Sequence, residues 1–210
     1  MRHEKLSEVR LPPGTPLLMA KQTFPWNGDG FLAGEALRLR DEHGLSIAVE
    51  TGTCIGVTTS WLADHFGKVV SCELIERFAD IARRVLGGRA LVRVEVGQSP
   101  DTIARCAYDD ALYFLDAHGI SGSGKEYCPL LDELEAIAEA KVKPCIIIHD
   151  FQVPGTDFGF DKMPDGRPFN LDLIRDHLDR IYGEDGWKHN YPTKVEGARR
   201  GWISIEPVKP

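Results

Sequence analysis

The sequence has no long hydrophobic run. The longest candidate, residues 145–148, is far shorter than the roughly 20 apolar residues that cross a bilayer. The chain opens on a charged segment, residues 1–5 (MRHEK), and the polar stretch that follows contains no apolar signal-peptide region. These absences exclude a membrane-spanning protein and predict a cytoplasmic chain with no membrane partner.

Cysteine is scarce and follows no pattern. The chain has five cysteines, an odd number, and none of them has the spacing of a CxxC pair. They are Cys54, Cys72, Cys106, Cys128 and Cys145. This argues against both a disulfide framework and a zinc site, so we expect small buried thiols in a reduced protein.

Basic residues are outnumbered by acidic ones. Lys and Arg total 25, Asp and Glu total 32, and the formal net charge is −7. The nearest approach to a basic cluster is residues 198–200 (ARR), which we interpret as a local feature. Nucleic-acid binding requires a basic face, so we expect a small-molecule substrate and no nucleic acid.

The length and composition are those of a folded domain. The chain has 210 residues, of which 42% are hydrophobic and 27% charged, and we find no internal repeat. A chain of this size buries roughly 70% of its unfolded surface. Disorder, collagen and coiled coil are excluded as overall descriptions. Residues 1–44 are expected to form an irregular arm and a helix, and residues 45–210 the main domain.

From residue 45 onward, the hydrophobic period alternates between that of strands and that of helices. Strands are predicted at residues 45–50, 68–73, 90–96, 111–116, 145–150, 187–194 and 201–206. Helices are predicted at residues 31–43, 58–66, 76–86, 100–106, 129–140 and 171–182. Such alternation predicts an α/β fold: a Rossmann-like, doubly wound, mostly parallel seven-stranded sheet. The last two strands are separated by a short link, residues 195–197, which predicts a C-terminal antiparallel hairpin at the sheet edge.

Ligands of such sheets bind beyond the carboxyl ends of the strands. The first strand runs into a glycine-containing turn, residues 50–59 (ETGTCIGVTT), in which Cys54 replaces the middle glycine of a dinucleotide motif. Glu50 would repel a pyrophosphate and attract a cationic ligand. S-adenosylmethionine, with its amino group and sulfonium, is such a ligand. A simple tight turn at Gly52 and Gly56 is the alternative.

The next two strands also end in polar residues. Glu73 can accept hydrogen bonds from both ribose hydroxyls of a nucleoside, a feature that sites for NAD and for S-adenosylmethionine share. Gln98 and Ser99 follow the third strand, where an adenine edge would lie. The alternatives are a solvated Glu73 and a turn or helix-capping role for Gln98 and Ser99.

A second polar set follows the fourth and fifth strands: Asp116, His118, His149 and Asp150. These strand ends are neighbours in a parallel sheet, and unpaired carboxylates there would repel each other. A divalent cation relieves the repulsion. Oxygen ligands suit Mg²⁺, and imidazoles also admit Mn²⁺, Fe²⁺, Co²⁺ or Zn²⁺. Alternatively, Asp116 caps a loop, Asp150 pairs with Lys or Arg, and His118 is structural.

These motifs resemble the class I S-adenosylmethionine-dependent methyltransferases from about Leu45 to Glu206. The spacing E-x-G-x-x-x-G-x-x-T, joined to Glu73, is similar to the catechol and caffeoyl-CoA O-methyltransferases. The resemblance implies that residues 45–210 form a catalytic domain covered by residues 1–44. It implies cofactor contacts from Glu50, Gly52, Thr53, Gly56, Thr58, Glu73, Gln98, Ser99 and Asp116.

The metal ligands of those enzymes match only in part. Asp116 matches the metal-binding Asp after the fourth strand, but His149-Asp150 stands where the family has Asp followed by Asn or Asp. The sequence Asp116-Ala117-His118 is similar to the cephalosporin-hydroxylase and rhamnosyl O-methyltransferase-like proteins. The implied ligands of a divalent metal are Asp116, His149 and Asp150, with Mg²⁺ as the first expectation.

The implied reaction is transfer of a methyl group to a small-molecule hydroxyl. A bound cation lowers the pKa of that hydroxyl, and His118 beside Asp116 is the expected base. Two alternatives remain: a metal-dependent hydrolase or isomerase on this fold, and a non-catalytic S-adenosylmethionine-binding protein. Aromatic residues of the arm and of residues 152–170 either wall the substrate or pin these segments to the core: Trp26, Phe158, Phe160 and Phe169. Exposed aromatics in the arm would instead make a contact in a homo-oligomer.

Overall fold

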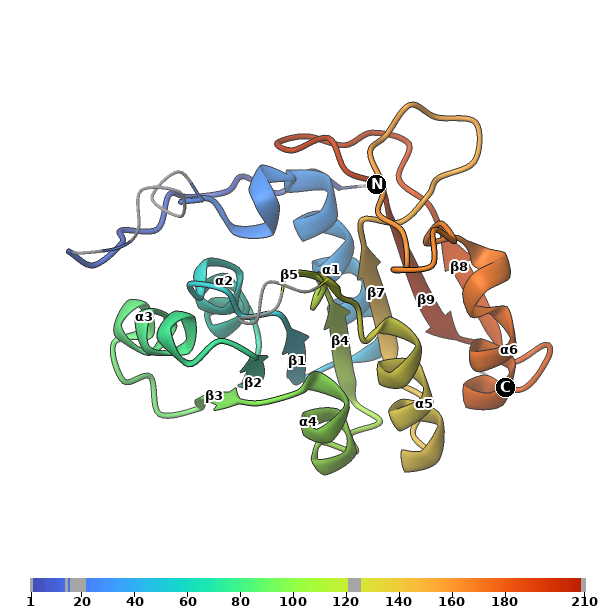
Figure 1. Ribbon diagram of the computed structural model, residues 1–210, viewed down its shortest axis with the longest axis horizontal. Helices are drawn as coiled ribbons and strands as arrows, with labels where there is room; N and C mark the ends of the chain where they lie inside the picture. The colour runs from blue at the N-terminus through green and yellow to red at the C-terminus, as the bar shows by residue number, and fades with distance from the viewer. Residues whose placement is uncertain (1, 14, 16–21, 121–125, 209–210) are drawn as a thin grey trace.

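A central seven-stranded sheet organises the molecule (Figure 1). The computed structural model describes residues 2–13, 15, 22–120 and 126–208. The strand order is β3-β2-β1-β4-β7-β9-β8, and β9 runs antiparallel to both of its neighbours. The strands are β1 (Ile47–Thr51), β2 (Lys68–Glu73), β3 (Val92–Val96), β4 (Ala111–Leu115), β7 (Cys145–His149), β8 (Trp187–Asn190) and β9 (Trp202–Pro207). The predicted fold class is confirmed.

Helices cover both faces of the sheet. One face carries α1 (Gly30–His43), α2 (Val57–His65) and α3 (Glu76–Leu86). The other carries α4 (Ser99–Arg105), α5 (Leu130–Ala140) and α6 (Leu171–Tyr182). A 3-10 turn, η1 (Pro25–Gly28), precedes α1, and two short strands, β5 (Gly119–Ile120) and β6 (Glu126–Tyr127), pair between β4 and α5. Between these two short strands, residues 121–125, where the sequence predicts a glycine-containing loop, lie outside the described residues.

The side chains of the central strand β4 are buried on both faces of the sheet. Tyr113 and Leu115 point into the apolar cluster beneath α4, α5 and α6, whereas Leu112 and Phe114 point into the cluster beneath α1 and α2. Successive side chains of a strand alternate between faces, so a strand covered on both sides reads as a continuous apolar run. This burial fixes the register and places the residues after β4 at the edge where β1 and β7 also end.

The hairpin prediction is correct in type and wrong in one detail. β8 and β9 pair antiparallel at the sheet edge, but the link between them spans residues 191–201, not residues 195–197. β8 ends at Asn190, and the segment after it contains Pro192, which has no N–H for a ladder. The longer link returns to the sheet at the carboxyl end of β7, where His149 pairs with Trp202.

The arm before α1 lies against the body of the protein. The Trp26 side chain is 1% exposed and packs edge-on against Trp61 and Phe114, and its backbone N–H donates to Oγ1 of Thr58 at 3.0 Å. Of the two alternatives predicted for Trp26, the structure supports the second: its ring fills the core and pins the arm there. Residues 14 and 16–21 of the predicted arm lie outside the described residues.

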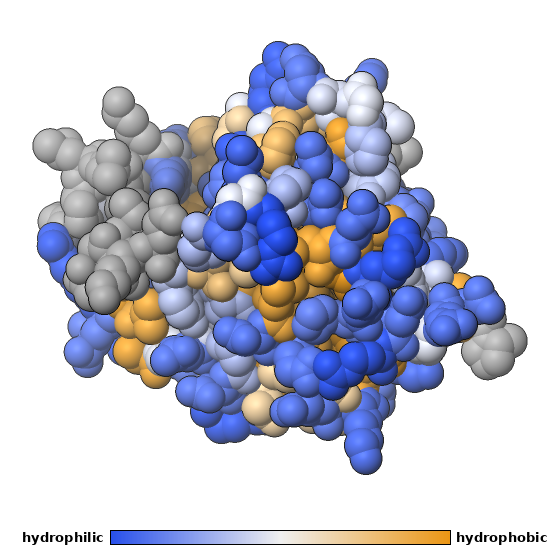
Figure 2. Space-filling view, turned by 45° about the vertical axis from the view of Figure 1, so that its right-hand side comes forward, coloured by the Kyte–Doolittle hydropathy of each residue, from blue (hydrophilic) through white to orange (hydrophobic). Residues whose placement is uncertain are grey.

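The described surface is mixed in character. Figure 2 shows hydrophilic residues over most of the visible face, with smaller hydrophobic areas between them. In the described part of the chain, no helix is both long and apolar enough to span a bilayer. The cytoplasmic location, the division of the chain at residue 45 and a homo-oligomer stay predictions.

A buried ion-pair network ties α1 to the last strand. Glu206 on β9 is 1% exposed and accepts hydrogen bonds from Arg38 at 3.0 Å and from His43 at 2.5 Å. Burial alone would raise the pKa of Glu206, but the bonds from His43 and Arg38 outweigh it and lower the pKa. Arg38 also binds Glu35 at 2.7 Å, and Glu35 accepts from Ser204 at 2.6 Å.

We expect Glu206→Gln to destabilise the protein by about 3 kcal/mol at pH 7, because Arg38 and His43 then lose the buried carboxylate that they share. A lowered folded-state pKa gives stability that is present above the unfolded pKa, about 4.3, and is lost as pH falls. The difference between variant and parent should therefore shrink below about pH 4. Urea unfolding at pH 7 and pH 4 measures it, with exposed Glu184→Gln as control. A loss below about 1 kcal/mol at pH 7 would contradict this account.

Candidate functional site

The glycines of the turn between β1 and α2 are required by the backbone and its neighbours. Gly52 has φ +80°, and a Cβ there would lie 2.5 Å from the carbonyl oxygen of Asp116. Gly56 has φ +81°, and its Cβ would lie 2.9 Å from that of Ala82 on α3. Positive φ and close approach both favour glycine. The turn therefore seats the end of β1 directly against the end of β4.

Glu50 lies inside the protein rather than at the mouth of the turn. It is 1% exposed, and its Oε2 accepts hydrogen bonds from the hydroxyls of Thr59 at 2.5 Å and Ser71 at 2.6 Å. Burial raises its pKa to about 7. The Thr53 hydroxyl lies 2.5 Å from that of Ser71. Glu50 and Thr53 thus join the turn to β2, and their contact with a ligand stays a prediction.

Glu73 lines a cavity beside the end of β2. Its Oε2 accepts from the backbone N–H of Cys54 at 2.7 Å, and its Oε1 from that of Ile75 at 2.8 Å. Burial raises the pKa of this carboxyl, and the two backbone donors oppose the effect. The cavity has a volume of about 180 Å³, and its lining includes Glu73, Gly52, Gly97, Ser99 and Asp116.

The remaining predicted cofactor residues divide between two environments. Ser99 is 3% exposed and lines the 180 Å³ cavity, whereas Gln98 is exposed, makes no side-chain capping bond and does not line it. Thr58 lines a second, smaller cavity of about 50 Å³, together with Glu50, Thr53 and Gly52. Gly52 and Asp116 line both cavities, so both spaces lie beside the end of β4.

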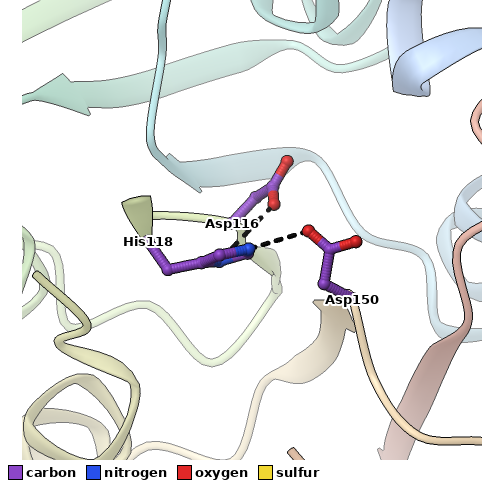
Figure 3. A group of neighbouring side chains, drawn as sticks. All are labelled: Asp116, His118 and Asp150. Carbon is purple, nitrogen blue, oxygen red and sulfur yellow. Dashed lines mark hydrogen bonds and ion pairs between the residues drawn. The ribbon is translucent and has the colours of Figure 1, made fainter. Parts of the chain in front are cut away.

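The residues after β4 and β7 form one cluster of acids and imidazoles (Figure 3). The His118 ring lies between two carboxylates: its Nε2 is 2.7 Å from Oδ2 of Asp150, and its Nδ1 is 3.8 Å from Oδ1 of Asp116. Nδ1 of His149 lies 3.2 Å from Oδ1 of Asp116 and 3.3 Å from Oδ2 of Asp150. All four predicted residues are thus brought together.

Two further members of the cluster were missed in the sequence. Asp161 lies 3.0 Å from Nε2 of His118, and Arg200 forms ion pairs with both Asp150 and Asp161. A signal for Arg200 was present, because the residue before an antiparallel last strand must lie where its parallel neighbour ends. The interpretation of residues 198–200 as a local feature did not include this role of Arg200. Asp161 lies in an irregular segment that carries no periodic signal.

Members of the cluster shift the pKa values of one another. Burial alone would lower the pKa of His118, but the hydrogen bonds to Asp150 and Asp161 raise it to about 10. Burial is likewise outweighed at His149, where Asp116 raises the pKa to about 10. Burial would raise the Asp150 pKa, but the two imidazoles lower it well below the usual range. In this arrangement His118 is a protonated donor to two carboxylates, and its role as a base stays a prediction.

Residues 152–170 are tied to the strand ends rather than free above them. The backbone N–H of Asp161 donates to the carbonyl of Asp150 at 2.8 Å, and Gly201 N–H donates to the carbonyl of Gly159 at 2.8 Å. Phe169 is 1% exposed and packs edge-on against His118, so of the two predicted alternatives it pins this segment to the core. The other two aromatics of this segment, at positions 158 and 160, are half-buried, and their role stays a prediction.

Because Gly52 lies directly against the backbone of Asp116, replacing it with a larger residue should lower the free energy of unfolding. Gly52→Ala should destabilise the protein by about 3 kcal/mol, because it adds a backbone clash to the strain of positive φ. Gly44→Ala is the matched control: its φ is +68°, but nothing lies within 4 Å of the new Cβ, so about 1 kcal/mol is expected. Denaturant unfolding compares the two, and equal losses would contradict the proposed contact with Asp116.

No family model matches the sequence, and no curated protein matches it. Solved structures do match. The chain is similar to the O-methyltransferase from Bacillus cereus in complex with SAH, with 24% identity, a TM-score of 0.59, and coverage of 91% of this chain and 87% of that one. It is also similar to the O-methyltransferase TomG from Streptomyces achromogenes, involved in tomaymycin synthesis, in complex with SAM. There the identity is 17%, the TM-score 0.60, and the coverage 86% of this chain and 81% of that one.

At these identities the likeness establishes architecture. It extends over most of both chains, and it agrees with the strand order and the terminal antiparallel strand described above. The chain therefore has the fold of the S-adenosylmethionine-dependent O-methyltransferases.

Proposed function

We propose that this protein transfers a methyl group from S-adenosylmethionine to the hydroxyl of a small molecule, with help from a divalent cation. One observation carries the proposal. Asp116 lines the same cavity as Glu73, and it also belongs to the Asp/His cluster. A cofactor and a cation bound in these two places would meet at one side chain. The complexes of similar structures with SAH and SAM support the choice of cofactor.

The 180 Å³ cavity suits the nucleoside part of the cofactor. Each oxygen of Glu73 accepts one backbone N–H, which leaves further lone pairs for two ribose hydroxyls. Gly97 and Ser99 line the far side, where the adenine would lie. The methionine part would extend past Gly52 into the 50 Å³ cavity beside Glu50, whose ionised form would favour the amino group and sulfonium.

The donor atoms of the cluster fit a divalent cation. Ligands 2.1 Å from an octahedral ion lie about 3.0 Å apart. The separations of Asp116 Oδ1 and Asp150 Oδ2 from His149 Nδ1 are 3.2 and 3.3 Å, and His118 Nε2 lies 2.7 Å from the same Asp150 oxygen. The expected ligands are Asp116, His149 and Asp150, with His118 able to replace or join His149. Mg²⁺ is the first ion to test, and the nitrogen donors also admit Mn²⁺.

Charge balance supports the same conclusion. Three carboxylates, those of Asp116, Asp150 and Asp161, face one guanidinium, that of Arg200. As the cluster stands, Arg200 and the two protonated imidazoles balance the three carboxylates. If a cation displaces both imidazole protons, a residual charge of −2 remains, which one divalent cation would neutralise. Arg200 binds Oδ1 of Asp150 and so turns Oδ2 toward the imidazoles. Such outer contacts orient metal ligands and are needed for tight binding.

Different residues of the chain would then bind the cofactor and accept the proton of the substrate hydroxyl. Glu73 and the glycine turn hold the cofactor so that its sulfonium faces Asp116. A bound cation supplies a lowered pKa for the substrate hydroxyl. His118, released from Asp150 and Asp161, accepts the hydroxyl proton at Nε2. The oxygen attacks the methyl carbon in line, the carbon–sulfur bond breaks, and positioning contributes most of the rate.

Calorimetric titration of S-adenosylhomocysteine tests the cofactor site. We expect saturable binding that weakens at least about tenfold in Glu73→Ala, because the ribose hydroxyls lose a charged acceptor. The exposed Glu76→Ala is the matched control and should bind as the parent does. Absence of binding with and without Mg²⁺ or Mn²⁺ would contradict the proposal and favour hydrolytic or isomerase chemistry at the cluster.

Titration of Mn²⁺ into chelator-treated protein tests the cation site. We expect Asp116→Asn to abolish specific binding and Arg200→Ala to weaken it about 10- to 100-fold, because Asp150 loses the contact that orients it. Arg199→Ala is the control, since Arg199 lies next to Arg200 but pairs only with Asp157 among the described carboxylates. Equal effects of the two arginine variants would contradict the assigned role of Arg200.

A further inference from the structure

The cavity of about 50 Å³ is lined in part by the segment before α1, residues 22–28, which we call the arm turn. Gln22, Phe24 and Asn27 line the cavity from this segment, and Glu50 and Asp116 line it from the strand ends. The three residues of the arm turn are exposed, whereas Glu50 is buried. The arm turn therefore forms the outer wall of the cavity, and whatever holds it in place determines the shape of that space.

The backbone of the arm turn is strained. Trp26 has φ 57° and Asn27 has φ 52°, so two successive residues other than glycine adopt the left-handed conformation. This conformation is unfavourable for a residue with a side chain, and it persists only where the surrounding structure holds it. Strain of this kind at the wall of a ligand cavity indicates that the position of the turn matters for function.

Two parts of the protein hold the arm turn. The Trp26 ring is buried in the core, and the Trp26 backbone N–H donates to Oγ1 of Thr58 on α2 at 3.0 Å. The second contact comes from residues 191–201, the link between β8 and β9. There the backbone N–H of Ala198 donates to the carbonyl oxygen of Asn27 at 3.2 Å. Segments from the two ends of the chain thus meet at this wall.

Gly197 is the residue that allows the link to lie so close to the arm turn. Its φ is +58°, and a Cβ there would lie 2.0 Å from the carbonyl oxygen of Asn27 and 2.8 Å from Cα of Gly28. Only glycine fits a contact of this kind between two backbones. Any larger residue at position 197 must push the arm turn and the link apart.

The link is the firmer of the two partners in this contact. Three residues beyond Gly197, the Arg200 side chain forms ion pairs with both Asp150 and Asp161. These ion pairs hold the link at the Asp/His cluster, whereas the strained arm turn relaxes when its contacts are weakened. We therefore expect that a larger residue at position 197 displaces the arm turn rather than the link.

We propose that Gly197 is a positioning residue that holds the arm turn as the outer wall of the 50 Å³ cavity, so that the protein selects ligands with an intact amino-acid part. This inference rests on the proposed function, which places the methionine part of the cofactor in this cavity. Gln22 and Asn27 carry amides, which can donate hydrogen bonds to a carboxylate. If the arm turn moves, the amino-acid part loses this wall, and the nucleoside part keeps its own partners.

The test compares the dissociation constants of S-adenosylhomocysteine and 5′-methylthioadenosine, measured by calorimetry. The second ligand keeps the adenosine and the thioether sulfur and lacks the amino and carboxylate groups. We expect the parent to prefer S-adenosylhomocysteine at least about 30-fold, because hydrogen bonds to those charged groups are lost in the shorter ligand. Gly197→Ala should lower this preference at least about tenfold and change the binding of 5′-methylthioadenosine by less than about threefold.

Two other glycines provide matched variants. Gly44 has φ +68° and nothing within 4 Å of an added Cβ, and Gly28 has φ +83° and an added Cβ 3.2 Å from Cα of Gly197. Alanine adds similar backbone strain at all three positions, so the contact with the neighbouring backbone is what differs. Gly44→Ala should keep the preference of the parent, and Gly28→Ala should give an intermediate value. Gly28→Ala also keeps the test valid should Gly197→Ala not fold, which near-ultraviolet circular dichroism checks.

The ratio of the two dissociation constants separates positioning from a structural role. If Gly197→Ala weakens both ligands equally, or if Gly197→Ala and Gly28→Ala both keep the preference of the parent, the inference is overturned. The same holds if the parent binds S-adenosylhomocysteine no more tightly than 5′-methylthioadenosine, although a cofactor site would then still exist. If the parent binds neither ligand, the proposed function fails and this inference fails with it.

Discussion

Three carboxylates meet at the carboxyl edge of the sheet, and their negative charges determine which residues can lie beside them. Asp116 and Asp150 are carried there by two buried parallel strands, and Asp161 is brought to them by backbone hydrogen bonds. Like charges this close require counter-charges. Two imidazoles and Arg200 supply them here, and their contacts tie residues 152–170 and 191–201 to the strand ends. A divalent cation would meet the same requirement while leaving an imidazole free for chemistry.

Most of the fold follows from local physics that the sequence displays. The apolar runs of β4 and β7 are buried on both faces, and the helical stripe of α5 packs on the sheet, as their periodicity predicts. The predicted link between β8 and β9 was too short. The polar residues after Asn190 do not alternate with apolar ones, so their sequence does not show where the strand ends. For Trp26 and Phe169 the sequence left two alternatives open, because the pattern around an aromatic residue in an irregular segment is the same whether it faces a ligand or the core.

The candidate site was predictable only where it follows from topology. Asp116, His118, His149 and Asp150 meet because parallel strands end at one edge, which the alternation of elements already implies. Asp161 depends on the path of a 19-residue irregular segment, residues 152–170, which no local rule fixes. The contact of Gly197 with the arm turn joins residues far apart in the sequence, so no local pattern shows it.

The central claim is that cofactor and cation meet at Asp116. Paramagnetic relaxation of S-adenosylmethionine labelled with ¹³C at the methyl carbon, bound to protein loaded with Mn²⁺, measures this most directly. The account predicts strong broadening of the methyl resonance that disappears when Mg²⁺ replaces Mn²⁺ and in Asp116→Asn. A methyl resonance of bound cofactor that Mn²⁺ leaves sharp would place the cation elsewhere and contradict the account.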